Sequence, residues 1–98
     1  MQYEGIWLAT SDENRKLVFE PNGVGYVQVE TEHFPYFRWR ASPEGMFWQF
    51  FKDAELSEIV SREVLLDCSV TCEKTQTILE FKHAPIPFGF KRFSKREA

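Results

Sequence analysis

The sequence has few of the residues from which catalytic and metal sites are usually built. Its 98 residues include two cysteines, Cys68 and Cys72, and two histidines, His33 and His83. Each histidine stands close to a turn proline, with no serine, cysteine or aspartate at the spacing of a nucleophile and its base. The two cysteines and His83 fit no standard zinc spacing, and no fourth ligand is evident. We therefore expect a protein that is not an enzyme and uses no metal or other cofactor.

The small number of cysteines also bears on the redox state. If Cys68 and Cys72 lie in one strand, their four-residue spacing separates them by roughly 13 Å. A disulfide requires Cα atoms closer than about 7 Å, so this pair cannot form one within the strand. The two residues share a strand face, and we expect two buried free thiols. Free thiols are typical of a reducing compartment, which predicts a cytoplasmic protein.

Long hydrophobic runs are missing as well. No stretch approaches the length of a transmembrane segment. The opening residues Met1-Gln2-Tyr3-Glu4 lack the basic start and the apolar run of a signal peptide. The chain also lacks a linker, a repeat or a low-complexity segment, which predicts a single small domain over residues 1–98 with no membrane contact.

Charge of either sign is modest, with a net charge of −3. Residues 53–80 hold seven acidic and two basic residues, whereas residues 81–98 hold five basic residues and one acidic residue. The basic end is either a solvated tail that protects a sheet edge or a site for an anionic partner. Arg38, Arg40 and nearby rings resemble a stacking platform for single strands, but phosphate contacts dominate such binding. The acidic body therefore makes nucleic acid an unlikely partner.

Aromatic residues are abundant, at 16% with ten Phe, and two hairpins can be assigned from them. One runs from Phe37 to Phe50 with the turn Ser42-Pro43-Glu44-Gly45 between its strands. A four-residue turn places Ala41 opposite Met46, Trp39 opposite Trp48, and Phe37 opposite Phe50. Side chains alternate along a strand, so these residues share one face and the arginines at 38 and 40 lie on the other.

The other hairpin turns at Pro21-Asn22-Gly23. Pro21 suits the second position of a type I turn, and Gly23 can adopt the left-handed conformation that follows. This loop sets Leu17 opposite Val27 and Phe19 opposite Gly25. A ring laid over a cross-strand glycine is a known compensation for the missing side chain.

Further strands follow from alternation and turn signals. They are expected at Tyr3 to Thr10, Arg15 to Glu20, Val24 to Thr31, 64–72, Thr77 to Lys82 and near Phe88 to Phe93. Residues 53–63 favour a short helix near 54–62, with Asp53 as its cap, over an irregular strand. The expected fold is mainly β: an antiparallel up-and-down meander closed, or nearly closed, into a small barrel.

The opening segment Tyr3-Glu4-Gly5-Ile6-Trp7, with Ser11-Asp12-Glu13-Asn14 after it, resembles the start of the calycins, the group of lipocalins and intracellular fatty-acid-binding proteins. The resemblance implies a lipocalin-like barrel whose floor is closed by Trp7 under a basic residue of the last strand, here Lys91 or Arg92. Arg92-Phe93-Ser94 keeps the arginine of the fatty-acid binders' Arg-x-Tyr but lacks the tyrosine.

Two binding hypotheses follow, and both are non-enzymatic. The first is an interaction module that binds a protein partner or a second copy, as a homodimer, through an outer sheet face of rings and arginines. Its interface residues would be Tyr36, Arg38, Arg40, Phe47 and Phe51. A solvated sheet face rarely carries this many rings, so we expect a cover, which would be the 53–63 segment, a second copy or another protein. The alternative is lipocalin-like binding of a small apolar or anionic ligand inside the barrel. Its ligand-binding residues would be Trp7, Trp39, Trp48, Phe50 and Arg92. Bulky rings crowd the interior of a small barrel, which favours the first hypothesis.

Overall fold

The alternating pattern of the sequence produces an all-β chain. The computed structural model describes residues 3–84 and 91–96, and none of these residues is helical. The strands are β1 (Gly5–Ala9), β2 (Asp12–Phe19), β3 (Val24–Val29), β4 (Glu32–Ser42), β5 (Gly45–Phe51), β6 (Val64–Leu66), β7 (Cys68–Cys72), β8 (Gln76–Phe81) and β9 (Arg92–Arg96). The described part of the chain contains no helix that could cross a membrane.

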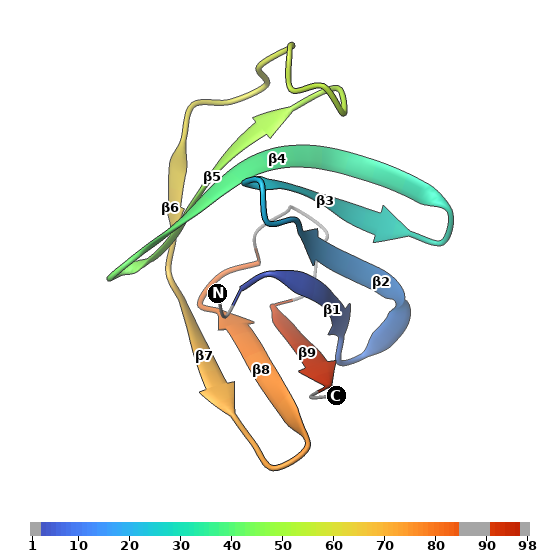
Figure 1. Ribbon diagram of the computed structural model, residues 1–98, viewed down its shortest axis with the longest axis vertical. Coiled ribbons are helices and arrows are strands. Elements are labelled where there is room, and N and C mark those ends of the chain that lie inside the picture. The colour runs from blue at the N-terminus through green and yellow to red at the C-terminus, as the bar shows by residue number, and fades with distance from the viewer. Residues whose placement is uncertain (1–2, 85–90, 97–98) are drawn as a thin grey trace.

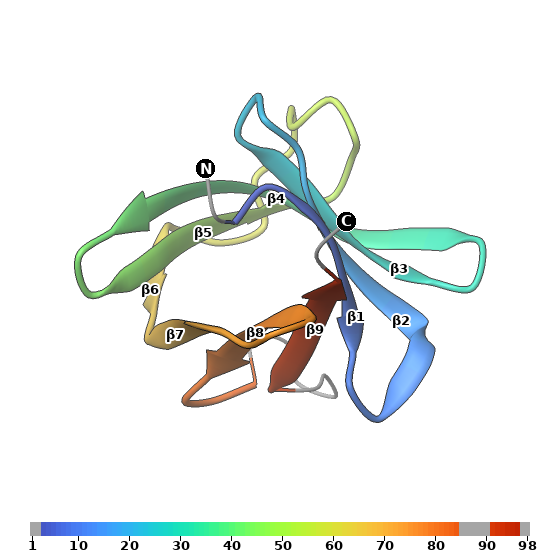
Figure 2. The same cartoon turned by 60° about the horizontal axis from the view of Figure 1, so that its bottom comes forward.

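The strands form one antiparallel sheet in the order β6-β5-β4-β3-β2-β1-β9-β8-β7. Sequence neighbours pair with the exception of β6 and β7, and β9 joins the start of the meander by pairing with both β1 and β8. The sheet curls until its two end strands meet, which gives a barrel with one unsealed seam (Figure 1; Figure 2). The predicted antiparallel meander and its near closure are confirmed.

The seam lies where a single extended run changes partners. The sequence predicts one strand over 64–72, but the run is divided at Asp67 into β6, which pairs with β5, and β7, which pairs with β8. The Asp67 carbonyl accepts a hydrogen bond from the Lys82 amide at 2.9 Å, so the change of partner takes one residue. Each half of the run is paired along one edge only, and its inward face is half-buried rather than buried.

The central hairpin has the predicted register. Ala41 lies opposite Met46, Trp39 opposite Trp48, and Phe37 opposite Phe50. The two indoles belong to the buried core, whereas Arg38 and Arg40 are exposed on the other face. β4 begins at Glu32, before the expected start at Phe37, because the strand passes through a bulge opposite β3 near Pro35.

The β2–β3 hairpin also matches its prediction. The Gly23 amide donates to the Glu20 carbonyl at 3.1 Å, and Gly23 has a φ of 87°, the left-handed conformation this loop requires. Leu17 pairs with Val27 and Phe19 with Gly25. The ring that lies over Gly25 is that of Phe37 on β4, whereas the sequence pointed to Phe19: a Cβ at Gly25 would stand 2.3 Å from Phe37 Cε1.

The helix predicted near 54–62 is wrong. Residues 53–63 form a turn followed by an irregular run along β5. The Asp53 carboxylate accepts hydrogen bonds from the backbone amides of Ser57 and Glu58, each at 3.0 Å, much as a helix cap would. Leu56 then takes a φ of 56°, which ends any helical turn. Ile59 forms a β-bridge with Phe51, because the edge of β5 supplies the backbone hydrogen-bonding groups that a helix would have supplied within itself.

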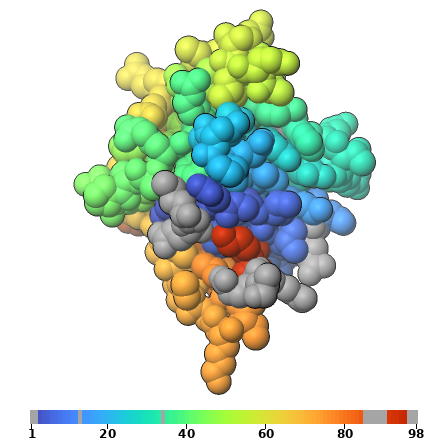
Figure 3. All heavy atoms as spheres, viewed as in Figure 1, coloured from blue at the N-terminus to red at the C-terminus, as the bar shows by residue number. Residues whose placement is uncertain are grey.

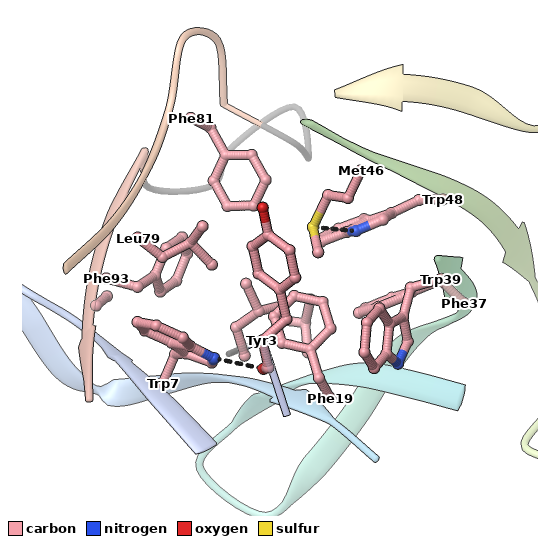
Figure 4. Packing of buried hydrophobic residues seen from close by; sticks show 13 residues of the cluster. Tyr3, Trp7, Phe19, Phe37, Trp39, Met46, Trp48, Leu79, Phe81 and Phe93 are labelled. Atoms are coloured by element: carbon pink, nitrogen blue, oxygen red, sulfur yellow. Dashed lines mark hydrogen bonds between the residues drawn. The ribbon is translucent and has the colours of Figure 1, made fainter. Parts of the chain in front are cut away.

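Aromatic rings fill the interior. Phe37 stacks on Trp48 with ring centroids 4.0 Å apart and planes 3° apart, and Phe19 meets Phe37, Trp39 and Trp48 edge-on. The indole nitrogens of the core are satisfied, since Trp7 donates to the Tyr3 carbonyl at 2.9 Å and Trp48 to the Met46 sulfur at 3.0 Å (Figure 4). Leu79 and Phe81 point inward and are buried.

Two further expectations change at the end of the chain. Both cysteines are free, but Cys68 is half-buried and Cys72 is exposed, so the expectation of two buried thiols is wrong. In the described residues the last strand runs from Arg92 to Arg96, so it extends past the predicted end at Phe93. Residues 85–90, which hold the start of the predicted strand, lie outside the described residues.

Candidate functional site

The predicted interface residues do share the outer face, but the chain already covers part of them. The Arg40 guanidinium lies over the Phe47 ring, 4.0 Å from its centroid, and forms a bidentate pair with Glu63 at 3.0 and 2.8 Å. This pairing raises the pKa of Arg40 and lowers that of Glu63, chiefly through the hydrogen bonds between them. Phe47 remains half-buried under this pair.

Phe51 is covered more completely. Its side chain is 3% exposed, because residue 59 pairs alongside it and Arg38 lies 5.6 Å from its ring centroid. Phe51 therefore offers almost no surface to a partner, whereas Arg38 and the half-buried Tyr36 still do. The cover that the sequence left open is, for this ring, supplied by the segment after β5.

A ring cluster that the sequence analysis did not assemble continues the outer face. His33 stacks on Tyr26 with centroids 4.2 Å apart and planes 22° apart, and Tyr36 lies 6.1 Å from Tyr26. His33 is exposed, so its place is in this surface cluster rather than in an isolated turn. The bulge in β4 brings the three rings together, and the sequence carries no direct sign of that bulge apart from Pro35.

The largest apolar exposure lies beside the seam. Among the described residues, the exposed large hydrophobic side chains are Ile6, Ile59, Val60, Val64 and Leu65. Four of these belong to the run 59–65, and we call Ile59, Val60, Val64 and Leu65 the seam strip. Leu65 pairs with Phe47 across the β5–β6 ladder, so this member of the strip continues the predicted interface, whereas Val64 lies opposite Trp48 and faces the other side. Residues 53–63 project at one end of the molecule, opposite the β7–β8 turn (Figure 3).

Four of the five predicted ligand-binding residues lie together in or against the aromatic core, and the fifth, Arg92, lies apart from them. Trp7 and Trp48 are fully buried and Trp39 is 6% exposed, all within the aromatic core. Phe50 packs against that core from its edge. Arg92 is exposed, and because its neighbour Phe93 points inward, Arg92 lies on the outer face.

The cation over Trp7 comes from a residue that the sequence analysis passed over. Lys95 Nζ lies 4.8 Å from the Trp7 ring centroid and donates to the Glu4 carbonyl at 2.8 Å. The resemblance to calycins implied Lys91 or Arg92 in this position, and that assignment is wrong. The register of β1 and β9 gives the reason: Ala9 lies opposite Phe93, which brings Trp7 beside Lys95. Lys91 lies before the strand, and Arg92 faces the other side.

A groove of about 620 Å³ lies on the outside of the barrel over β1, β8 and β9. It is lined by Ile6, Leu8, Ala9, Thr10, Lys16, Gln76, Ile78, Arg92, Ser94 and Lys95. The described lining holds three cations and no carboxylate. Lys16 and Arg92 make no ion pair with any described residue, so their charges remain available to a ligand.

Groups suited to chemistry are sparse in the described part of the chain. No cluster of three or more His, Cys, Asp or Glu side chains there is placed to hold a metal ion. Burial raises the pKa of the Cys68 thiol, which keeps it protonated and weakly nucleophilic.

Comparison of the chain with protein-family models, with curated proteins and with solved structures finds no match.

Proposed function

We propose that this chain is a non-enzymatic interaction module that contacts another protein surface, with a second copy of itself as one such surface. The observation that carries the proposal is the seam strip. Four large apolar side chains stand exposed in seven consecutive positions, next to the half-buried Phe47. Leu65 lies opposite Phe47 on the outer face, whereas Val64 lies opposite Trp48 and faces the other side. Large apolar side chains gathered in one short segment at a sheet edge mark a contact site, whereas singly scattered ones do not.

The surroundings of the strip support the same proposal. Phe47, Arg38 and Arg40 adjoin it, and aromatic residues with arginine are enriched at protein interfaces. The Arg40–Glu63 pair fixes one guanidinium over Phe47, so this part of the surface is ordered before a partner arrives. An ordered surface loses less conformational entropy on binding.

The test uses the purified protein and the double variant Ile59→Ser/Leu65→Ser. Both side chains are largely exposed, at 64% and 46%, so the variant should fold as the wild type does. We expect the mass of the wild type, measured by sedimentation velocity, to rise with protein concentration, and the variant to stay monomeric. A wild type that remains monomeric at high concentration would exclude self-association. The proposed contact would then have to be with another protein, which should bind the wild type and not the variant.

The groove over β1, β8 and β9 favours a second candidate function, the binding of a small amphipathic anion. Ile6, Leu8 and Ile78 supply apolar surface, and Lys16 and Arg92 supply unpaired charge. Its volume falls within the roughly 300–1,000 Å³ usual for small-molecule sites. This candidate keeps the anionic ligand of the alternative hypothesis but moves it from the interior, which rings occupy, to the outside.

Decanoate, with decanol as the uncharged probe, tests this candidate by calorimetry. Lys16→Glu/Arg92→Glu should weaken decanoate binding at least about tenfold, because two charge-assisted contacts are lost. Lys52→Glu is the matched control, since it reverses one exposed charge on another strand end and should leave binding unchanged. Equal affinity for decanol, or an unaffected double variant, would remove the candidate.

A further inference from the structure

The open edge of β7 is set by the hydrogen-bond pattern of its ladder with β8. At the two ends of the ladder, the Glu73 amide donates to the Gln76 carbonyl at 2.8 Å and the Lys82 amide to the Asp67 carbonyl at 2.9 Å. In an antiparallel pair, residues alternate between bonding to the partner and facing away from it. Asp67, Glu73 and every second residue between them therefore bond to β8.

The backbone N–H and C=O groups of the remaining residues point away from β8. Ser69 and Thr71 bond to β8, so the N–H and C=O groups of Cys68, Val70 and Cys72 face the other edge. β7 stands at the end of the sheet order, and no described strand pairs with that edge. Figure 1 shows the side of β7 away from β8 without a neighbouring labelled element.

The edge carries none of the usual protections against strand addition. Residues 68–72 contain no proline, no lysine and no other charged side chain, and their register with β8 runs without a bulge. Natural edge strands are normally blocked by such features. On this side of the sheet β5 pairs with β6, but β5 begins at Gly45 and does not extend beside β7.

The charges at the two ends of the edge select its occupant. Asp67 and Glu73 are exposed and flank the strand. A second copy added by two-fold symmetry about Val70 would place Asp67 opposite the partner's Glu73, and like charges directly opposite each other are destabilising. A segment with a basic residue at each of these positions would instead form two favourable cross-strand pairs.

We infer that the open edge of β7 binds an extended segment of a partner protein, apolar on alternate positions and basic at both ends, as an added strand. The inference rests on the proposed function, because it gives one form that the partner contact takes. Its surface is the β7 backbone edge, which is separate from the seam strip, so different variants test the two.

The probe is the peptide Lys-Val-Thr-Val-Thr-Val-Lys, with Glu at both ends as its charge control. In register with residues 67–73, its valines fall opposite Cys68, Val70 and Cys72 and its lysines opposite the two acids. We expect the Lys peptide to bind at least about tenfold more tightly than the Glu peptide, measured by calorimetry. Absence of binding by the Lys peptide, or equal binding of the two peptides, would overturn the inference.

N-methylation tests the backbone bonds without altering the protein. The amides of the peptide valines face β7, so methylating all three should weaken binding at least about tenfold. Methylating the threonine amides, which face away, should leave binding unchanged. Equal effects of the two modifications would show that the peptide does not bind as an added strand.

Val70→Pro makes the same test on the protein side. It removes one outward N–H while leaving every hydrogen bond to β8, so the variant should keep its fold and lose peptide binding. Ile59→Ser/Leu65→Ser should retain peptide binding, which separates a failure at this edge from a failure of the seam strip. Self-association that Val70→Pro alone abolishes would identify the occupant as a second copy and contradict the basic segment.

Discussion

At the scale of single residues, Gly25 shows how tightly the core is packed. A Cβ there would lie 2.3 Å from Phe37 Cε1 and 2.7 Å from the Val18 carbonyl oxygen. Both distances are shorter than any real contact, and the carbonyl belongs to the backbone and cannot turn away. The space left by this glycine is therefore used by the ring of Phe37.

Gly25→Ala should lower the free energy of unfolding by about 2–3 kcal/mol, because the added methyl displaces a packed ring and strains the ladder. Urea denaturation measures the change. Gly25→Ala/Phe37→Leu is the control, since a smaller side chain at 37 makes room for the methyl and should recover part of the loss relative to Phe37→Leu alone. No loss on Gly25→Ala would show that the ring does not depend on this space.

The two cysteines should differ in reactivity. Cys72 is exposed, whereas Cys68 is half-buried with a raised pKa, mainly from desolvation. The thiolate is the reactive form, so iodoacetamide at mildly alkaline pH should modify Cys72 first. Peptide mass spectrometry over time measures both sites, and denaturant should bring their rates together. Modification of Cys68 at the rate of Cys72 in the folded protein would contradict the assignment.

At the scale of secondary-structure elements, the turn at 53–58 depends on one carboxylate. Asp53 accepts bonds from the Ser57 hydroxyl and from the amides of Ser57 and Glu58. The hydrogen bond from the Ser57 hydroxyl is the largest cause of its lowered pKa, followed by that from the Glu58 amide. Because the folded pKa is lowered, the stabilisation is present above the ordinary Asp pKa and is lost as pH falls through the folded value.

An acid titration followed by NMR checks this turn. The amide signals of Ser57 and Glu58 should move together, with a midpoint below the usual range for aspartate. Asp53→Ala should abolish that titration and speed amide exchange at both positions while leaving β5 protected. Two amides that titrate at the ordinary aspartate value would show that the carboxylate does not hold the turn.

The hairpins could be predicted from sequence because their determinants are local. The turn residues and two-residue alternation set the Trp39–Trp48 and Leu17–Val27 pairs, and both pairs are observed. Residues 53–63 could not be assigned in this way. Their apolar spacing suits a helix. The observed structure depends instead on the free edge of β5, where the Phe50 carbonyl accepts a hydrogen bond from the Val60 amide.

The candidate surfaces were only partly accessible to sequence reasoning, for the same reason. Alternation correctly placed Arg38 and Arg40 on the face opposite Trp39. It placed Phe51 there too and left the 53–63 segment as one candidate cover, but it did not place Ile59 beside that ring. The seam strip was missed because Ile59 and Val60 belong to the segment expected as a helix. Val64 and Leu65 belong to the 64–72 run, whose strictly alternating pattern indicates a continuous strand and not the observed division at Asp67.

At the scale of the whole molecule, the barrel is held shut where β1 meets β9. The two strands share the register pairs Leu8–Ser94 and Ala9–Phe93. Lys95 extends this contact by reaching across to Trp7 and to the Glu4 carbonyl. One side chain thus joins two segments that lie 91 positions apart.

Lys95→Met keeps the aliphatic stem but removes the ammonium group, and should lower the free energy of unfolding by about 1–2 kcal/mol. Thermal and urea denaturation measure the loss, and Trp7 emission should change in the folded state. Lys91→Met is the matched control, because Lys91 is exposed and should stay within about 0.5 kcal/mol of the wild type. Equal effects of the two substitutions would show that the Trp7 contact contributes little.

The β1–β9 pairing also bears on how the protein is made in the cell. A ribosome releases β1 first and β9 last, so a growing chain must hold the edge of β1 unpaired while almost everything else emerges. During that interval Lys95 does not yet cover Trp7. Ribosomes on one messenger RNA also hold several growing chains close together, each with the same unpaired β1 edge. The order of synthesis therefore makes the closing strand the step at which folding competes with aggregation.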